Sequence, residues 1–117
     1  MMSDMTKIEI ITRQSKFEEL KTALNEIGIN GMTVYNVLGY GVQRGHKRTY
    51  RGAEYTIDLI PKIKVEMVVC TVPVQSVVDT ALNVLRTGEF GDGKIFISKV
   101  EKVIKVRTGE EDKEALL

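Results

Sequence analysis

Apolar and polar positions along the first third of the chain predict a strand, a helix and a second strand. Residues Lys7–Arg13 alternate with a β-branched bias, which is typical of a half-buried strand. Residues Ser15–Ile27 carry apolar side chains at helical spacing, and Ser15 with Glu18 predicts a capping box at the helix start. Gly28 suits the helix end, and Met32–Leu38 is again strand-like.

The second half of the chain repeats this order. Pro61 opens a predicted strand over Lys62–Val72, and Pro73 suits the start of a helix. That helix shows a continuous apolar stripe. The stripe consists of Val74, Val77, Val78, Ala81, Leu82 and Leu85. A glycine-rich break over 87–93 follows, and then a long extended segment, Lys94–Val106, that can bend near Ser98–Val100.

This order of elements, β-α-β, loop, β-α-β, predicts the fold class. Two interleaved crossover units make an α+β, ferredoxin-like sandwich with one antiparallel sheet and two helices on one face. We therefore expect a single domain over residues 1–117, ending in a charged tail over 109–117. The other sheet face also carries apolar residues, so we expect an oligomer that buries it.

Between the second and third strands lies a long polar loop, with 41–58 as its extended part. It is spaced by glycines and carries four cations and the lone histidine: Arg44, His46, Lys47, Arg48 and Arg51. Loops of this length in compact domains are uncommon and usually functional or disordered. We expect an excursion away from the body of the protein that carries function.

Composition excludes several classes of protein. The 17 basic and 16 acidic residues nearly cancel, which argues against a general nucleic-acid or membrane binder. No apolar run approaches the ~20 residues needed to span a bilayer, and we recognise no signal peptide. The one cysteine, Cys70, excludes an internal disulfide and fits a reducing cytoplasm.

The chemistry that the residues suggest is anion binding. In Gly91-Asp92-Gly93-Lys94, two glycines let backbone amides approach an anion and Lys94 adds a cation. Lys105 and Arg107 are two apart on the predicted terminal strand and would share its face. Together they make a polyphosphate site plausible. A tight turn and a solvated strand face remain the simpler alternatives.

Catalytic and metal motifs are lacking in the sequence. Nothing resembles a nucleophile–base pair, and one His and one Cys do not make a zinc or iron site. A Mg²⁺ held mainly by nucleotide phosphates needs only one or two protein oxygens, which Gln43 can supply.

Two long motifs closely resemble the nitrogen-regulatory PII signal-transduction family. Residues 50–55 (Tyr-Arg-Gly-Ala-Glu-Tyr) are similar to its loop signature, and 87–100 are similar to its C-terminal signature. The resemblance runs from about Lys7 to Asp112. It implies a homotrimer of ferredoxin-like subunits that binds ATP or ADP between subunits and senses 2-oxoglutarate.

The resemblance also implies site residues. Thr33 and Val68 would meet adenine, and the base of the loop would complete the pocket through Gly39, Tyr40, Gly41, Val42 and Gln43. The phosphates would contact Gly91, Asp92, Gly93, Lys94, Lys105 and Arg107. Gln43 would ligate Mg²⁺ held by ATP, and both Gln43 and Lys62 would contact 2-oxoglutarate.

By the same resemblance, the loop tip acts on partners. Arg51 would contact an ammonium channel, drawing a cytoplasmic protein to the inner membrane face, or the loop would engage nitrogen-assimilation enzymes or regulators. Tyr55 is the candidate for modification by a nucleotidylyltransferase. No direct nucleic-acid binding and no membrane insertion are expected.

The sequence departs from the family pattern at several positions. Val42 stands where arginine is common, Lys105 replaces a usual arginine, and Arg13-Gln14-Ser15 replaces Lys-Pro-Phe. Ala53 replaces the serine that cyanobacterial relatives phosphorylate.

We therefore expect a non-enzymatic regulator of nitrogen metabolism. Alternatives are a PII relative dedicated to nitrogenase, a small phosphate-transferring enzyme on the same fold, and an RNA-binding module.

Overall fold

The computed structural model describes residues 5–40, 47–50, 53–56 and 59–117. Its strands are β1 (Thr6–Thr12), β2 (Thr33–Tyr40), β3 (Lys47–Tyr50), β4 (Ala53–Thr56), β5 (Leu59–Val69) and β6 (Lys94–Lys99). Its helices are α1 (Phe17–Glu26), α2 (Val74–Leu85) and the short α3 (Lys113–Leu116), with a single 3-10 turn at Gln14–Lys16.

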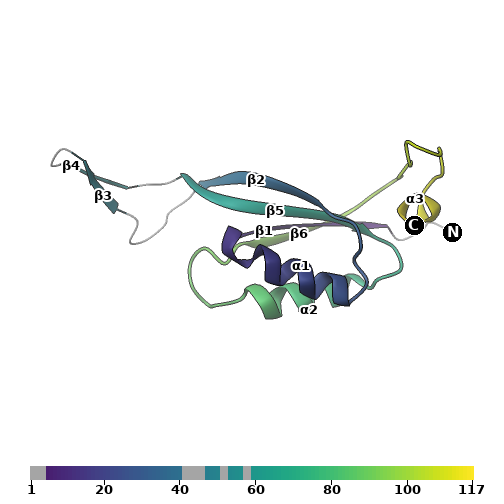
Figure 1. The fold of residues 1–117 in the computed structure, drawn as a ribbon, viewed down its shortest axis with the longest axis horizontal. Helices are drawn as coiled ribbons and strands as arrows, with labels where there is room; N and C mark the ends of the chain where they lie inside the picture. Colours follow the sequence, from purple (N-terminus) through teal and green to yellow (C-terminus); the bar gives the residue numbers. More distant parts are fainter. Residues whose placement is uncertain (1–4, 41–46, 51–52, 57–58) are drawn as a thin grey trace.

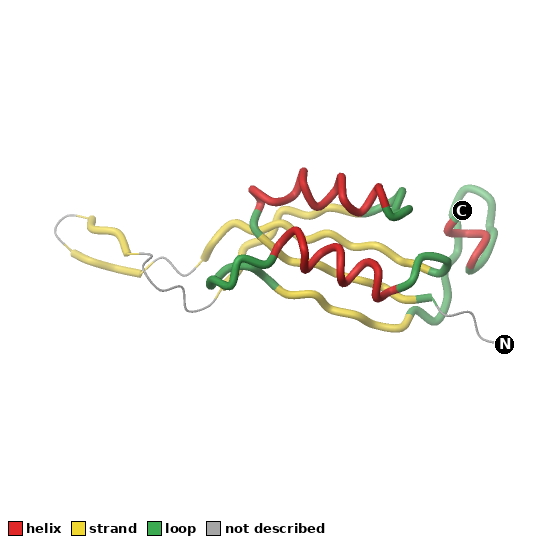
Figure 2. Tube along the Cα trace, turned by 90° about the horizontal axis from the view of Figure 1, so that it is seen from below, coloured by secondary structure: helices red, strands yellow, loops and turns green. Residues whose placement is uncertain are grey.

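The main sheet has the strand order β2-β5-β1-β6, and every neighbouring pair is antiparallel. Both long helices lie on the same face of this sheet (Figure 1 and Figure 2). This is the ferredoxin-like arrangement expected from the sequence, with β1 and β5 in the middle and β2 and β6 at the edges.

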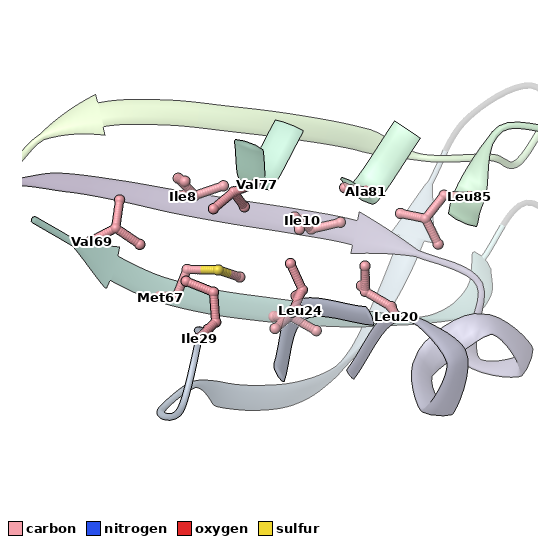
Figure 3. Packing of buried hydrophobic residues seen from close by; sticks show 11 residues of the cluster. Ile8, Ile10, Leu20, Leu24, Ile29, Met67, Val69, Val77, Ala81 and Leu85 are labelled. Carbon is pink, nitrogen blue, oxygen red and sulfur yellow. The ribbon is translucent and has the colours of Figure 1, made fainter. Parts of the chain in front are cut away.

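The core lies between the sheet and the two helices. The predicted apolar face of β5 is buried, and so are Ile8 and Ile10 of β1. Figure 3 shows these strand residues packed against Leu20 and Leu24 of α1 and against one side of α2. From α2 the fully or nearly buried residues are Val77, Ala81 and Leu85, spaced as one helical stripe.

The middle of the open sheet face carries a charged network rather than an apolar surface. Lys7 pairs with Glu66 at 2.8 Å and with Glu9 at 3.1 Å, and Lys64 lies 3.6 Å from Glu9. The hydrogen bonds from Lys7 and then Tyr35 lower the pKa of Glu66 to about 2. These side chains are half-buried already in one subunit.

The sheet has two ends that matter for function. We call the end where β1 finishes and β6 begins the loop end, and the opposite end, beside residues 100–117, the tail end. Figure 1 shows β3 and β4 beyond the loop end, paired as a two-stranded sheet of their own. The predicted excursion therefore contains a hairpin in its described part.

Two sequence predictions about local structure are wrong. Lys16 occupies the cap position of α1 without a side-chain bond, because Ser15 is taken up in the 3-10 turn, so the Ser15–Glu18 capping box does not form. The long terminal strand ends at Lys99, so Lys94, Lys105 and Arg107 do not share one strand. After Lys99 the chain instead forms a turn closed by bonds between Lys105 and Glu110 and between Val103 and Asp112.

Candidate functional site

The turn that joins α2 to β6, residues 87–93, lies at the loop end and depends on its glycines. Gly88, Gly91 and Gly93 have φ values of 87°, 98° and 106°, in the region that side chains disfavour. At Gly93 a Cβ would also collide with the backbone carbonyl of Ile11. The turn can therefore pack directly against the end of β1 only because this residue has no side chain.

The Asp92 carboxylate organises this turn from within. It accepts bonds from the Thr87 amide at 2.7 Å and the Gly88 amide at 2.9 Å, and also from the Thr87 hydroxyl. Arg13 Nη1 completes the set at 2.6 Å. The Thr87 hydroxyl first, and then Arg13, hold the pKa of Asp92 well below its usual range. This carboxylate is already occupied by protein donors, so a phosphate contact by Asp92 would have to use its backbone amide.

Three consecutive carbonyls of the turn are bound by side chains from the sheet. Phe90 O accepts from Arg13 Nη2 at 2.7 Å, Gly91 O from Lys62 Nζ at 2.9 Å, and Asp92 O from Thr12 Oγ1 at 2.8 Å. The carbonyl of a trans peptide points opposite to the following amide. The amides of Gly91, Asp92 and Gly93 therefore point away from these three anchors, as in a backbone anion site.

Lys62 brings a second cation to the same place. It is only 8% exposed, and burial first, then the nearby Arg13, lower its pKa. A side chain on Gly91 would lie 3.0 Å from Arg13 Nη2 and 3.4 Å from Lys62 Nζ, so both cations flank this glycine. A lysine that is buried beside another cation is stabilised by an added anion.

The base of the long loop adjoins this cluster. Gly39 of β2 pairs with Ile60 of β5, and a Cβ there would lie 3.2 Å from Lys62 Cγ. Tyr40 is 78% exposed at the end of β2. Lys94 begins β6 directly after the turn and is exposed. Of the predicted loop residues, Gly41, Val42, Gln43 and Arg51 lie outside the described residues.

The other predicted site residues lie at the tail end. Thr33 begins β2, and Val68 stands one position before the end of β5. Both line a cavity of about 800 Å³ together with Gly28–Met32 and the C-terminal segment. Lys105 Nζ donates to Leu117 O at 3.0 Å, and Arg107 lies exposed in the turn that follows.

The predicted nucleotide residues are thus divided between the two ends of one subunit. The loop end holds Gly39, Tyr40, Lys62 and the Gly91–Lys94 turn, and the tail end holds Thr33, Val68, Lys105 and Arg107. The length of β6 alone, from Lys94 to Lys99, separates the two ends by roughly 17 Å at about 3.4 Å per residue.

Sequence reasoning missed three residues of the loop-end cluster. Thr12 is the last residue of β1, Arg13 follows it, and Thr87 begins the turn. The antiparallel register of Ile11 with Lys94 places the end of β1 beside the turn. If the sequence had allowed us to predict that β1 pairs with β6, this register would have indicated Thr12 and Arg13 as residues of the site.

Tyr55, the candidate for modification, lies on β4, where its Cα partner across the hairpin is Arg48 of β3. Tyr50 of β3 pairs with Ala53 of β4.

Comparison with known proteins identifies the family. The family model described as nitrogen regulatory protein P-II matches residues 5–110. The chain belongs to the P-II family. It is 49% identical over 112 residues to the nitrogen regulatory protein P-II of Klebsiella oxytoca and to P-II 1 of Escherichia coli K12. In each case the match covers 96% of this chain and 100% of the relative.

Solved structures agree in fold with this P-II chain. A Bacillus subtilis GlnK–ATP complex matches with a TM-score of 0.81 at 41% identity, over 99% of both chains. Arabidopsis thaliana PII bound to citrate matches with a TM-score of 0.76 at 39% identity, over 97% of this chain and 92% of that one.

Membership of the P-II family settles the broad function. The chain is a nitrogen regulatory protein and not an enzyme, as the motifs at 50–55 and 87–100 predicted. No helix in the described part of the chain is long and apolar enough to cross a membrane.

Proposed function

We propose that this P-II protein senses adenine nucleotides and 2-oxoglutarate at a site shared between copies of the chain. In this proposal ATP and ADP compete for the site, and ATP brings Mg²⁺. The observation that carries the proposal is the turn at 87–93. Its three anchored carbonyls direct the amides of Gly91, Asp92 and Gly93 outward, next to Lys94.

The phosphates are assigned to the loop end. Backbone amides and a lysine side chain together can bind the negatively charged oxygens of a polyphosphate. The Asp92 carboxylate, which would repel phosphate, is instead held by hydrogen bonds from Thr87 of the same turn and from Arg13. The structure of a GlnK–ATP complex at 41% identity supports ATP as the nucleotide.

The shared site follows from the separation of the two ends. Lys105 and Arg107 lie at the opposite end of the sheet from the Gly91–Lys94 turn of their own subunit, and in this proposal they contact that turn in a neighbour. Adenine would likewise contact Thr33 and Val68 at the tail end. A closed ring in which the tail end of one copy meets the loop end of the next satisfies this arrangement. A homotrimer is the assembly that we propose.

Mg²⁺ and 2-oxoglutarate are assigned to the base of the long loop. Gln43 would supply an oxygen to a Mg²⁺ held mainly by ATP phosphates, and the effector would complete the coordination of the metal. Lys62 would pair with an effector carboxylate, since its buried ammonium has only Gly91 O as a hydrogen-bond partner among the described residues. ADP lacks the γ-phosphate, so the effector should bind with ATP and not with ADP.

The output would be the long loop. Its described hairpin, β3 and β4, lies beyond the loop end (Figure 1). Occupancy at the base can therefore change the position of the tip. The proposed partners are an ammonium channel, contacted through Arg51, or nitrogen-assimilation enzymes and regulators, with Tyr55 as the modification site.

Calorimetry with the full chain tests the proposal. Titration with Mg-ATP should show binding, and 2-oxoglutarate should then bind to the Mg-ATP form but not to the ADP form. Lys94→Ala should weaken ATP binding, whereas Lys21→Ala, which removes a half-exposed cation paired with Glu18 on α1, should not. Absence of nucleotide binding at millimolar concentration would refute the proposal.

A further inference from the structure

We propose that Arg13 and Asp92 form a latch that fixes the 87–93 turn in its anion-binding shape. Arg13 is then a positioning residue for the nucleotide phosphates and does not touch them. This inference rests on the proposed nucleotide site and names what sets its affinity.

The geometry of Arg13 is that of a two-point clamp. Its Nη1 donates to Asp92 Oδ1 at 2.6 Å and its Nη2 to Phe90 O at 2.7 Å. The planar guanidinium makes both bonds in one orientation, so the positions of Phe90 and Asp92 are fixed relative to the end of β1. The side chains of Arg13 and Asp92 are 29% and 23% exposed, which limits solvent screening of the pair.

Asp92 passes this constraint to the rest of the turn. The same carboxylate that accepts from Arg13 also accepts from the amides of Thr87 and Gly88, at the start of the turn. One side chain thus ties together the beginning of the turn, its end and β1. Without Arg13 the turn remains closed on itself through Asp92, but it loses two of its four side-chain bonds to the sheet.

The other two anchors cannot replace the latch. Thr12 holds only the Asp92 carbonyl, and Lys62 holds only that of Gly91. In the proposed function Lys62 also serves an effector carboxylate. Of the two charged anchors, Arg13 is therefore the one to which the proposed function gives no contact with a ligand. If the turn already has its bound conformation, less conformational entropy is lost when phosphate binds, and the affinity is higher.

Calorimetry of the full chain with ATP and with ADP tests the latch. Arg13→Ala should weaken both nucleotides about tenfold, a change of about 1.4 kcal/mol, because the latch acts on the turn and not on the γ-phosphate. Arg86→Ala is the matched control, because it removes the same charge from an exposed position one residue before the turn. The control should bind at wild-type strength, and an equal loss there would contradict the latch.

A double-variant cycle separates a latch from a direct phosphate contact. Asp92→Asn should also weaken binding, and the loss in the Arg13→Ala/Asp92→Asn double variant should be smaller than the sum of the two single losses, because both changes remove the bond between Arg13 and the Asp92 carboxylate. Losses that add would show that Arg13 acts on phosphate independently and would overturn the inference. Arg13→Lys, which cannot make the two-point clamp, should recover only part of the affinity. Full recovery would contradict the clamp.

Amide hydrogen exchange on the nucleotide-free protein gives an independent measurement. Arg13→Ala should speed exchange at residues 87–93 while leaving the amides of α1 unchanged. Unchanged exchange in the turn would overturn the latch. This measurement still applies if wild-type protein binds no nucleotide, so a failure of the proposed function and a failure of the latch are distinguishable.

Discussion

The two ends of the main sheet differ in how they present charge. At the loop end Arg13, Lys62 and Asp92 lie close together, and each makes hydrogen bonds within the subunit. At the tail end Arg107 is exposed in a turn and the neighbouring Val106 is 98% exposed. The three charged side chains of the loop-end cluster are thus bonded within the subunit, whereas Arg107 at the tail end is exposed.

In the proposed function, one subunit would contain two halves of a site and not a whole site. The loop end has the fixed backbone amides that a phosphate needs, and the tail end has two further cations and a cavity lined by Thr33 and Val68. Under this proposal the two halves would meet only when a second copy packs against the first. Nucleotide binding and association of subunits are therefore expected to be coupled.

The largest expected effect is at Gly93, in the loop end. Gly93→Ala should destabilise the fold by about 3 kcal/mol or more, since the new Cβ meets the Ile11 carbonyl in addition to the strained φ. Gly88→Ala is the matched control, because its φ is also positive but no atom lies within 4 Å of the added Cβ. It should cost about 1 kcal/mol. Urea unfolding measures both, and equal losses would contradict the close packing of the turn on β1.

The next effect compares the two ends directly. Lys94→Ala and Arg107→Ala should each weaken ATP about tenfold or more, although the two residues lie at opposite ends of one subunit. Neither should change the free energy of unfolding by more than about 0.5 kcal/mol, since both side chains are exposed. Binding isotherms and urea curves measure these quantities. A loss confined to Lys94→Ala would show that the tail end takes no part.

A further comparison concerns Lys62, in the loop end. Lys62→Met should abolish effector binding but weaken ATP only a fewfold, because Arg13 and Thr12 still anchor the turn. Titration of 2-oxoglutarate into the Mg-ATP form measures the first effect and titration of ATP the second. Loss of ATP binding with the effector response retained would contradict the assignment of Lys62.

The smallest effect is a pH dependence at Asp92. Because the folded protein holds the pKa of Asp92 below its ordinary value of 3.8, the ionised form favours folding. This contribution is complete at neutral pH and is lost as the pH falls below about 3.8 and through the lower folded value. Urea midpoints of wild type and Asp92→Asn should therefore converge in acid. A constant difference between them would contradict this role.

The sequence predicted the sheet and its helices because burial produces strong periodic patterns. Alternation in β5 matches a buried face, and so do Val77, Ala81 and Leu85 of the predicted α2 stripe, although Leu82 of that stripe is exposed. The sequence predicted the glycine turn and Lys94 as well, since glycines with a following lysine form a local signal.

What could not be predicted depends on contacts between distant residues. Arg13 and Asp92 are 79 positions apart, and only the pairing of β1 with β6 brings them together. Lys105 and Arg107 were expected on the strand of Lys94 because their apolar neighbours Ile104 and Val106 alternate as in a strand. Those apolar side chains are instead exposed, at 57% and 98%, in a turn after the strand has ended.

The most direct test of a shared site is to mix two variants that each bind ATP weakly. Lys94→Ala and Arg107→Ala subunits are unfolded together, refolded as a mixture and titrated with ATP, with each variant refolded alone as the control. If every site takes Lys94 from one copy and Arg107 from the next, random assembly of an equal mixture should restore high-affinity binding at about a quarter of the sites. Binding no stronger than that of the separate variants would contradict a site shared between copies.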